Sequence, residues 1–305
     1  MSSNRLIPRL PDQFSGKWHH KSYTILKELG RGANGAVYLA LCSSRKVAVK
    51  VGADPFDLLI EVNMLKSVDQ DQSLRIGPRL YEVDDLLIAG RSYSFYAMEY
   101  VEGERLDDYV DRIGRDWVVV LLIQVLTRLE VLHQQGWVFG DVKPDNILVG
   151  RADKQVHLID FGGVSQIGRA VRQFTEDYDR AVWQAGDRRA EPSYDLFAVA
   201  LMMIRLSIGR DSWHTIRNQV RHLPVLYDII RGNKELYLFR EPILKALNGN
   251  FASAEEMKRE LVGILCHRSS GTPPRQRGSA AEFWIGGLFV ASLLLLASSL
   301  YYLWM

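Results

Sequence analysis

A short loop with three polar residues at fixed spacing constrains this chain more than any other feature. The segment GDVKPDNILV (140–149) places Asp141, Lys143 and Asn146 at positions 0, +2 and +5, directly before an apolar strand. Asp141 can accept a hydrogen bond from a substrate hydroxyl, and Lys143 can neutralise charge on a moving phosphoryl group. Asn146 can offer Mg²⁺ a hard oxygen ligand. The pattern predicts a loop that serves phosphoryl transfer.

An Asp-Phe-Gly triplet lies shortly after this loop. Asp160 follows a short predicted strand over residues 156–159 and would add an anionic metal ligand to the amide of Asn146. Phosphoryl transfer depends mainly on positioning and on electrostatic stabilisation. The loop and the triplet together offer both.

A glycine-rich segment near the N-terminus is the third feature. Gly30, Gly32 and Gly35 lie in GRGANGAV, between strands predicted at 23–29 and 37–41. Alone this spacing is weak evidence, because dinucleotide-binding folds use it between a strand and a helix. Between two strands, glycines let backbone N–H groups close over phosphate oxygens with no Cβ in the way.

A lysine and a glutamate complete the set. Lys50 ends the apolar strand predicted at 46–51, and Glu61 follows eleven residues later on a helix predicted at 57–68. A lysine ending an apolar strand is costly unless its ammonium finds a partner. We expect Glu61 to be that partner and to hold the ammonium where it can bridge two phosphates. Taken alone, Glu61 would be interpreted as one more solvated helix charge.

The order of predicted elements indicates a two-lobed α+β fold. A β-rich N-lobe is expected over about 23–98 and a larger helical C-lobe over about 104–266, because long helical patterns begin near Trp117. Residues 1–22 are expected to form an N-terminal extension. The 23–266 region is predicted to be one catalytic unit, since no long polar gap interrupts it.

The five elements GRGANGAV, VAVK, Glu61, GDVKPDN and DFG occur in the order and near the spacing of one family. Over about 23–266 the chain resembles bacterial Hanks-type (eukaryotic-like) Ser/Thr protein kinases. The resemblance implies ATP-dependent phosphorylation of Ser and Thr hydroxyls in proteins, including the kinase itself. It implies ATP and Mg²⁺ as cofactors, with Mn²⁺ as an alternative metal. The implied catalytic residues are Asp141, Lys143, Lys50 and Glu61, and the implied metal ligands are Asn146 and Asp160.

The resemblance also implies a nucleotide site. Residues 98–103 would be the hinge between lobes, where backbone groups of Glu99 and Val101 bind adenine. Asp195 would brace the catalytic loop from a helix. The implied nucleotide-binding residues are Gly30, Gly32, Gly35, Val37, Ala48, Lys50, Glu99, Val101 and Leu148, of which Val37, Ala48 and Leu148 sandwich the ring.

Two residues favour Ser/Thr over Tyr as the acceptor. Lys143, two residues after Asp141, is the Ser/Thr-type choice within the family. Thr175 matches the threonine that ties the substrate loop to the catalytic Asp and Lys.

The chain departs from the family pattern at three places, one of which is a gap between Lys50 and Glu61 that is shorter than usual. Phe139-Gly140 replaces His-Arg, and Phe139 is expected to pack near Phe161. Without an arginine at Gly140, a phosphorylated activation loop loses its main partner, so we expect activity without such phosphorylation. The Ala-Pro-Glu element is absent and Arg180-Ala-Val stands in its expected place, which predicts a differently built floor for the substrate.

The C-terminus predicts a membrane anchor. Residues 283–305 carry no charge, and 23 residues in a helix span about 34 Å, enough for a bilayer core of about 30 Å. Trp284 lies at one end and Tyr301, Tyr302 and Trp304 at the other, as in aromatic belts. A basic Pro/Ser/Gly linker, 267–282, precedes this run and favours a cytoplasmic kinase domain. We therefore expect a single-pass, C-terminally anchored protein of the cell membrane. It is most similar to the small tail-anchored kinases of endospore-forming bacilli. This resemblance implies a role in sporulation.

Contacts of these C-terminal segments are open. Arg268, Arg275 and Arg277 would mainly set topology, and contact with anionic lipid or nucleic acid is the alternative. Gly287 and Ala291 form a small-xxx-small pair that would fit a homodimer. The formal net charge of +2 gives no global argument for nucleic-acid binding. Two isolated cysteines form no disulfide framework.

Two other functions stay open. A pseudokinase scaffold would bind nucleotide without turnover, yet Lys50, Glu61, Asp141, Asn146 and Asp160 are all present. A small-molecule kinase of related fold is the second alternative. The glycine loop, Lys143 and Thr175 favour a protein substrate.

Overall fold

The computed structural model describes residues 8–32, 35–68, 76–172, 174–218 and 220–270. Its contacts divide the chain into two units, Met1–Ile264 and Leu265–Met305. The features below concern the first unit unless stated otherwise.

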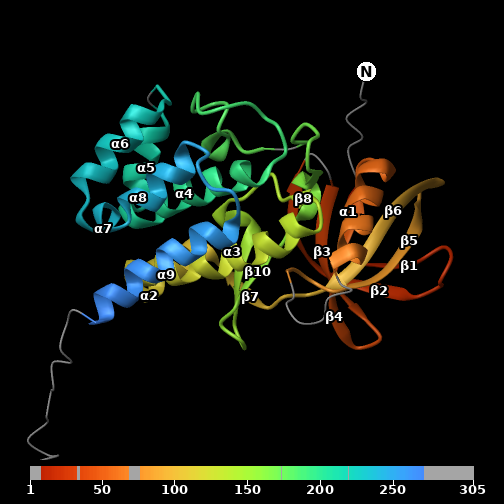
Figure 1. Ribbon diagram of the computed structural model, residues 1–305. Coiled ribbons are helices and arrows are strands. Elements are labelled where there is room, and N and C mark those ends of the chain that lie inside the picture. The colour runs from red at the N-terminus through yellow and green to blue at the C-terminus, as the bar shows by residue number, and fades with distance from the viewer. Residues whose placement is uncertain (1–7, 33–34, 69–75, 173, 219, 271–305) are drawn as a thin grey trace, which may run out of the picture. The chain divides into compact units, whose positions relative to one another are not determined.

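A six-stranded antiparallel sheet and one helix form the N-terminal lobe (Figure 1). The strand order is β1-β2-β3-β4-β6-β5, and helix α1, Pro55–Val68, contacts β4, β5 and β6. The strands predicted at 37–41 and 46–51 are confirmed and form the hairpin β3–β4. Ser43 and Ser44 both adopt positive φ at its turn, as tight β-hairpin turns require. The strands are β1 Gln13–Ser15, β2 Ser22–Gly32, β3 Gly35–Cys42, β4 Arg45–Gly52, β5 Leu80–Ile88 and β6 Arg91–Glu99.

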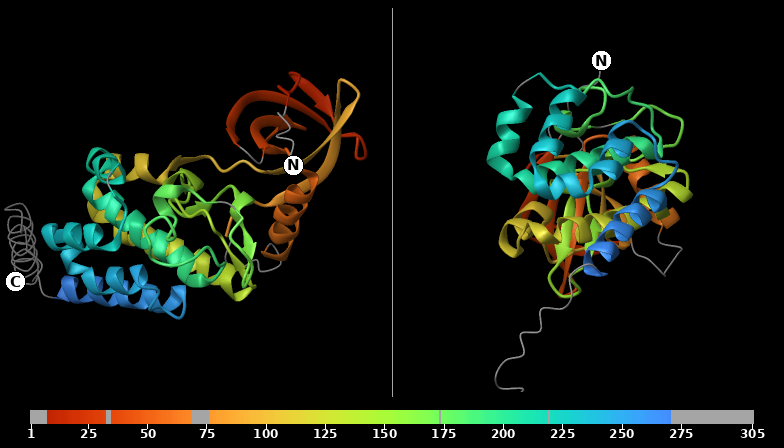
Figure 2. Two further views of the ribbon diagram at one scale, coloured as in Figure 1. Left: turned by 90° about the horizontal axis from the view of Figure 1, so that it is seen from above. Right: turned by 60° about the vertical axis from the view of Figure 1, so that its left-hand side comes forward.

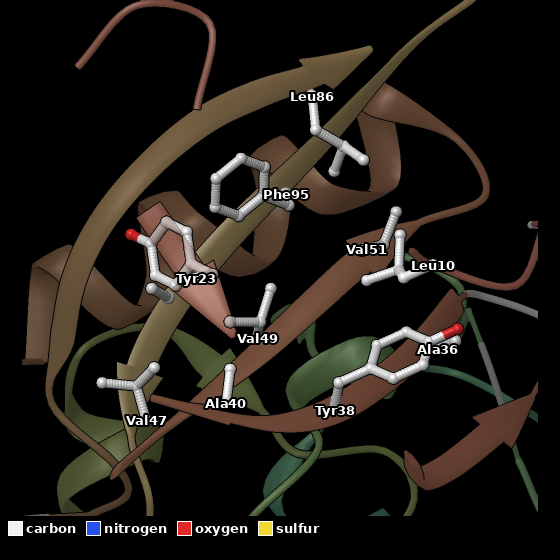
Figure 3. Close-up of a cluster of buried hydrophobic side chains, with 11 residues drawn as sticks. Leu10, Tyr23, Ala36, Tyr38, Ala40, Val47, Val49, Val51, Leu86 and Phe95 are labelled. Carbon is white, nitrogen blue, oxygen red and sulfur yellow. The ribbon is translucent and has the colours of Figure 1, made fainter. Parts of the chain in front are cut away.

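One face of this sheet carries its own hydrophobic cluster, which includes Leu10 (Figure 3). The ring of Phe14, on β1, stacks on Tyr23 at 5.1 Å between centroids and meets Phe95 edge-on at 5.3 Å. Burying a side chain of this size contributes about 1.5–3 kcal/mol. The expectation that residues 1–22 form an extension is therefore corrected for residues 10–22, because Leu10 and Phe14 supply part of the core of this lobe.

Helices dominate the C-terminal lobe, and α4 lies at its centre (Figure 2). Helix α4, Pro192–Ile208, is buried along most of its length and contacts α3, α5, α6, α7 and α8. Its start has Pro192 in the first turn and its end has Gly209 at φ 88°, the usual placement of these residues. The other helices are α2 Leu106–Ile113, α3 Val118–Gln134, α5 Arg210–Arg217, α6 Leu223–Gly232, α7 Lys234–Leu238, α8 Arg240–Leu247 and α9 Ala254–Ser270.

Two small sheets lie between the helices and the N-lobe. One has the order β10-β9-β7, and the other pairs β11 with β8. A single 3₁₀ turn at 144–146 leads directly into β9, and another at 161–163 follows β10. The loops that carry Asn146 and Asp160 are therefore each joined to a strand of the β10-β9-β7 sheet. The strands are β7 Gly103–Arg105, β8 Trp137–Val138, β9 Ile147–Gly150, β10 Val156–Leu158 and β11 Ser165–Gln166.

The predicted two-lobed α+β layout is confirmed, with one change at its C-terminal boundary. Helix α9 runs to Ser270, so the linker expected at 267–282 does not begin at residue 267. The residues 267–270 contain neither glycine nor proline, which begin at Gly271, and the helix therefore continues. Within the described residues, no helix combines the length and apolar character needed to cross a bilayer. The predicted membrane segment 283–305 lies outside the described residues.

Candidate active site

A cleft of about 880 Å³ lies between the two lobes. The glycine loop and β3–β4 line it from the N-lobe, residues 98–101 line it at the hinge, and the loops around Asn146 and Asp160 line it from the C-lobe. The structure brings nearly all of the predicted site residues to this one cleft. Those lining it are Gly30, Gly32, Gly35, Val37, Ala48, Lys50, Glu99, Val101, Asp141, Lys143, Asn146, Leu148 and Asp160.

Glu61 lies behind this lining and reaches Lys50 from helix α1. The Lys50 Nζ donates to both carboxylate oxygens of Glu61, at 2.8 and 2.7 Å, and to Asp160 Oδ1 at 2.8 Å. The Tyr96 hydroxyl donates to Glu61 Oε2 at 2.8 Å from the strand position paired with Lys50. The predicted Lys50–Glu61 contact is present, and Lys50, Glu61 and Tyr96 are all buried.

Burial and charge act against each other in this cluster. Burial alone would lower the pKa of Lys50, but the carboxylates of Glu61 and Asp160 outweigh it and raise that pKa. Burial would raise the pKa of Asp160, but the Lys50 ammonium holds it below its usual value. Burial raises the pKa of Glu61 against the opposing effect of Lys50. Lys50 therefore stays charged in a dry environment, as a group that contacts phosphate must.

The catalytic loop gathers its groups around one carboxylate. Lys143 Nζ donates to Asp141 Oδ2 at 2.6 Å and to Thr175 Oγ1 at 2.9 Å. The Thr175 hydroxyl donates to Asp141 Oδ1 at 2.8 Å, which confirms the predicted tie between this threonine and the loop. Asn146 Nδ2 donates to the Asp141 backbone oxygen at 2.9 Å and to its Oδ2 at 3.1 Å. Asp141 is thereby held in one orientation by Lys143, Asn146 and Thr175.

A buried aspartate on α4 holds this loop from below, as the resemblance implies. Asp195 Oδ2 accepts from the Phe139 backbone N–H at 2.8 Å, and its Oδ1 accepts from the Gly140 N–H at 2.9 Å. His133 Nε2 lies 2.9 Å from Asp195 Oδ2. The side chain of Asp195 is fully buried, so these contacts are the partners that its charge requires.

The backbone conformation at position 140 explains why a glycine stands there. Gly140 adopts φ 79°, and a Cβ there would lie 2.5 Å from the Gly163 backbone oxygen. Any side chain would force this loop away from the Asp-Phe-Gly segment. Beside it, Phe139 meets Phe161 edge-on at 5.4 Å between ring centroids, as predicted.

The donor set in the cleft fits a hard divalent cation. Asn146 uses its amide nitrogen on Asp141, which leaves the amide oxygen for a metal. Asp160 uses Oδ1 on Lys50, and half of its side chain is exposed in the cleft. One neutral and one anionic oxygen ligand, with the remaining positions open to water and phosphate, suit Mg²⁺.

The floor beyond Thr175 is built from arginine–carboxylate pairs. Arg180, in the expected place of the Ala-Pro-Glu element, donates to Glu191 at 2.7 Å, to Asp187 Oδ1 at 3.0 Å and to the Ser193 hydroxyl at 2.9 Å. A buried arginine and its partners thus stand where the Ala-Pro-Glu element was expected, and the predicted difference in the substrate floor stays a prediction.

Four contributors escape the sequence reasoning: Tyr96, His133, Asp57 and Arg172. Tyr96 and His133 each contact a site carboxylate from a different element, and nothing in their local sequence marks them. Arg172 forms an ion pair with Asp57 from 115 residues away. Pairs at such separation carry no local signal, because neither partner belongs to a motif.

Comparison with known proteins agrees with this geometry. The protein kinase domain family matches residues 23–281, and the chain therefore belongs to the protein kinase family. It is 46% identical over 249 residues to the serine/threonine-protein kinase YabT of Bacillus subtilis, which covers 81% of this chain and 72% of that protein. It is 23% identical over 279 residues to a probable serine/threonine-protein kinase, PknB, of Lactococcus lactis, covering 81% of this chain and 42% of the relative.

Solved structures show the same fold. The structure of vaccinia related kinase 3 superposes with a TM-score of 0.60 at 16% identity, covering 87% of this chain and 94% of that one. At such low sequence identity, the likeness shows a shared fold and nothing further. The chain thus has a protein kinase fold with a β-rich N-lobe and a helical C-lobe.

Proposed function

We propose that this protein kinase phosphorylates Ser and Thr hydroxyls of proteins, itself included, with ATP as the donor. The observation that carries the proposal is the closed set of bonds among Asp141, Lys143 and Thr175 at the floor of the cleft. It leaves a carboxylate and an ammonium at the place where an acceptor hydroxyl and a γ-phosphoryl group would meet. The similarity to YabT supports Ser/Thr as the acceptor class.

Asp141 would accept the hydrogen bond of the acceptor hydroxyl and orient its oxygen for in-line attack. Lys143, which already bonds Asp141 and Thr175, would neutralise charge that develops on the transferred group. The bond that forms joins the acceptor oxygen to the γ-phosphorus, and the bond that breaks is the one to the β-phosphate bridging oxygen. The acceptor proton leaves toward the Asp141 side of the cleft.

The donor nucleotide would lie between the glycine loop and the floor. Backbone groups of Glu99 and Val101 at the hinge would bind adenine, with Val37, Ala48 and Leu148 around the ring. Lys50, fixed by Glu61, would contact the α- and β-phosphates. The glycines 30, 32 and 35 would close over the phosphates.

Asn146 and Asp160 would hold Mg²⁺, or Mn²⁺ in its place. The metal supplies charge neutralisation to the phosphate oxygens when it is bound. Asp160 is anionic there because the Lys50 ammonium keeps its pKa low.

A transfer assay tests the proposal. The purified chain should move labelled γ-phosphate to a generic protein and to itself, and Asp141→Asn should lower kcat by at least a hundredfold. Asp116→Asn is the matched control, because that carboxylate is exposed and lies outside the cleft lining. Phosphoamino-acid analysis should find phosphoserine and phosphothreonine.

The same assay separates the alternatives. A pseudokinase scaffold would bind ATP, measured by thermal shift, and yet give no label in any protein. A small-molecule kinase would consume ATP only when low-molecular-weight acceptors are added. Either result would overturn the proposal.

We further propose that the chain is anchored in the cell membrane by one helix over 283–305, with the kinase domain, 23–266 and its N-terminal strand, in the cytoplasm. The uncharged run and the basic linker support this topology. Removal of 283–305 should shift the protein from the membrane fraction to the supernatant while transfer activity persists. An unchanged membrane fraction would contradict the anchor. Three further predictions remain. They are a homodimer through Gly287 and Ala291, a role in sporulation, and contact of three C-terminal arginines with lipid or nucleic acid (Arg268, Arg275 and Arg277).

A further inference from the structure

The segment between Asp160 and Glu191 has almost no hydroxyl groups that a kinase could modify. Its Ser and Thr residues are Ser165 and Thr175. Ser165 is buried, donates to the Gly163 backbone oxygen at 3.1 Å and accepts from the Arg172 backbone N–H at 3.1 Å. Thr175 is engaged with Asp141 and Lys143. Neither hydroxyl is free in this conformation to accept a phosphate.

The arginine that would bind such a phosphate is also absent from position 140. Position 140 carries no side chain, and the left-handed φ and the close approach of Gly163 leave no room for one. The segment is nevertheless folded, and its Thr175 contacts the catalytic carboxylate. Contacts between unmodified side chains must therefore set its position.

Arg172 makes one such contact with the N-lobe. Its Nη2 donates to Asp57 Oδ1 in the first turn of helix α1. The two side chains are partly buried, with 28% and 37% of their surfaces exposed, so solvent screens their attraction only in part. A carboxylate at this position also interacts favourably with the N-terminal end of the helix dipole.

Asp57 lies four residues before Glu61, so the two side chains project from the same side of helix α1 on successive turns. Glu61 is the residue that holds the Lys50 ammonium. Fixing the first turn of α1 to the segment after Asp160 therefore also limits the movement of Glu61 toward or away from Lys50. The position of the segment between Asp160 and Glu191, called the substrate-side segment below, is thereby coupled to the position of Lys50.

We propose that Arg172 is a positioning residue: its ion pair with Asp57 holds helix α1, and with it the Lys50–Glu61 pair, in the working arrangement, in place of a phosphorylated activation segment. The inference rests on the proposed roles of Lys50 and Glu61. It assigns to an encoded arginine what a phosphate and its arginine partner would otherwise do. The kinase is then active as synthesised.

A charge-reversal cycle on the full chain tests this. Arg172→Gln and Asp57→Asn should each lower kcat about two- to tenfold, because a half-buried ion pair is lost, while the KM for the protein substrate stays within twofold. Arg172→Glu and Asp57→Lys should lower kcat further, since each puts two like charges together. The kcat of the double variant D57K/R172E should be about tenfold higher than that of either reversed single variant. Two independent sites would not show this non-additivity.

The matched control is Arg169→Gln, three residues earlier in the same segment. Arg169 is exposed, and among the described residues only its backbone makes hydrogen bonds. It should keep the wild-type kcat. Thermal unfolding of every variant identifies any that fail to fold, and those are replaced in the cycle by the Gln and Asn forms.

A second readout does not depend on catalysis. Amide hydrogen exchange in 58–65 should become faster in Arg172→Gln and should recover in D57K/R172E relative to R172E. If the chain transferred no phosphate at all, the proposed function would fail, but this exchange pattern would still test the ion pair. Equal kcat in wild type, Arg172→Gln and Asp57→Asn, or a double variant no better than the single ones, would overturn the proposal. Loss of activity after phosphatase treatment of the wild type would overturn it too.

Discussion

The catalytic loop and the substrate-side segment lie next to each other but are held by different forces. One fully buried carboxylate, Asp195, fixes the backbone of Phe139 and Gly140 from the centre of the C-lobe. After Thr175, buried Asp179 accepts from the Tyr194 hydroxyl, but the ion pairs of Arg180 with Asp187 and Glu191 have partly exposed partners. The loop that performs the chemistry is thus part of the core. The surface that would receive the substrate depends in part on charges that solvent, salt and pH can reach.

Loss of Asp195 should give the largest effect. Asp195→Asn replaces an acceptor with a donor beside two buried N–H groups, and leaving buried partners unpaired costs about 3 kcal/mol. We expect that loss in the free energy of unfolding, measured by denaturant titration, with a fall in kcat of at least a hundredfold.

Asp211→Asn is the control for this change, since Asp211 is an exposed acidic residue on the next helix. It should unfold as the wild type does. If Asp195→Asn lost no more stability than Asp211→Asn, the distinction between a core-held loop and a surface-held segment would be wrong.

Thr175 lies where the two regions meet, so its replacement should rank second. Thr175→Val removes the hydroxyl that joins Asp141 to Lys143 while it keeps the shape of the side chain. Hydrogen bonds to charged groups contribute about 1.5–3 kcal/mol, which corresponds to a fall in kcat of about 10- to 100-fold. Thr175→Ser should retain most of the rate, and steady-state kinetics of the pair would measure the difference. Similar rates for the two variants would mean that the hydroxyl has no part in positioning.

How far the sequence predicts the structure follows the same division. Asp141, Lys143 and Asn146 lie within six residues of each other, so their convergence could be predicted from spacing alone. Lys50 and Glu61 could be paired because one strand and one helix connect them.

The remaining contacts are long-range or depend on backbone geometry. The Arg172–Asp57 pair joins residues 115 apart, and Tyr96 reaches Glu61 from a strand 35 residues away. The need for glycine at 140 depends on a positive φ and on the approach of Gly163, which only the folded chain shows. The strand that carries Phe14 has only three residues, too few to show an alternating pattern, so the sequence does not assign Phe14 to the sheet.

Arg180 tests the surface-held side with a moderate effect. Arg180→Gln removes the donors that bind Asp187, Glu191 and Ser193, and we expect a loss of about 1–2 kcal/mol in unfolding free energy. The KM for a protein substrate should rise about fivefold, while slow hydrolysis of ATP by water stays near the wild-type rate. Arg189→Gln, a neighbouring exposed arginine, should change neither. A fall in ATP hydrolysis equal to the fall in protein phosphorylation would show that Arg180 acts on the chemistry instead.

The smallest effect is the pH dependence of that same region. The N–H of Arg189 and the Arg180 guanidinium lower the pKa of Asp187; burial would raise the pKa of Glu191, but Arg180 lowers it. A carboxylate with a lowered pKa stabilises the fold above its unfolded pKa, about 4, and loses that contribution as pH falls through the folded value. The melting-temperature gap between wild type and Arg180→Gln should thus be constant from about pH 7 to 5 and shrink below about pH 4. A gap that stays constant through pH 4 and below would mean that Arg180 stabilises the segment by packing, since protonation of its partners would then remove nothing.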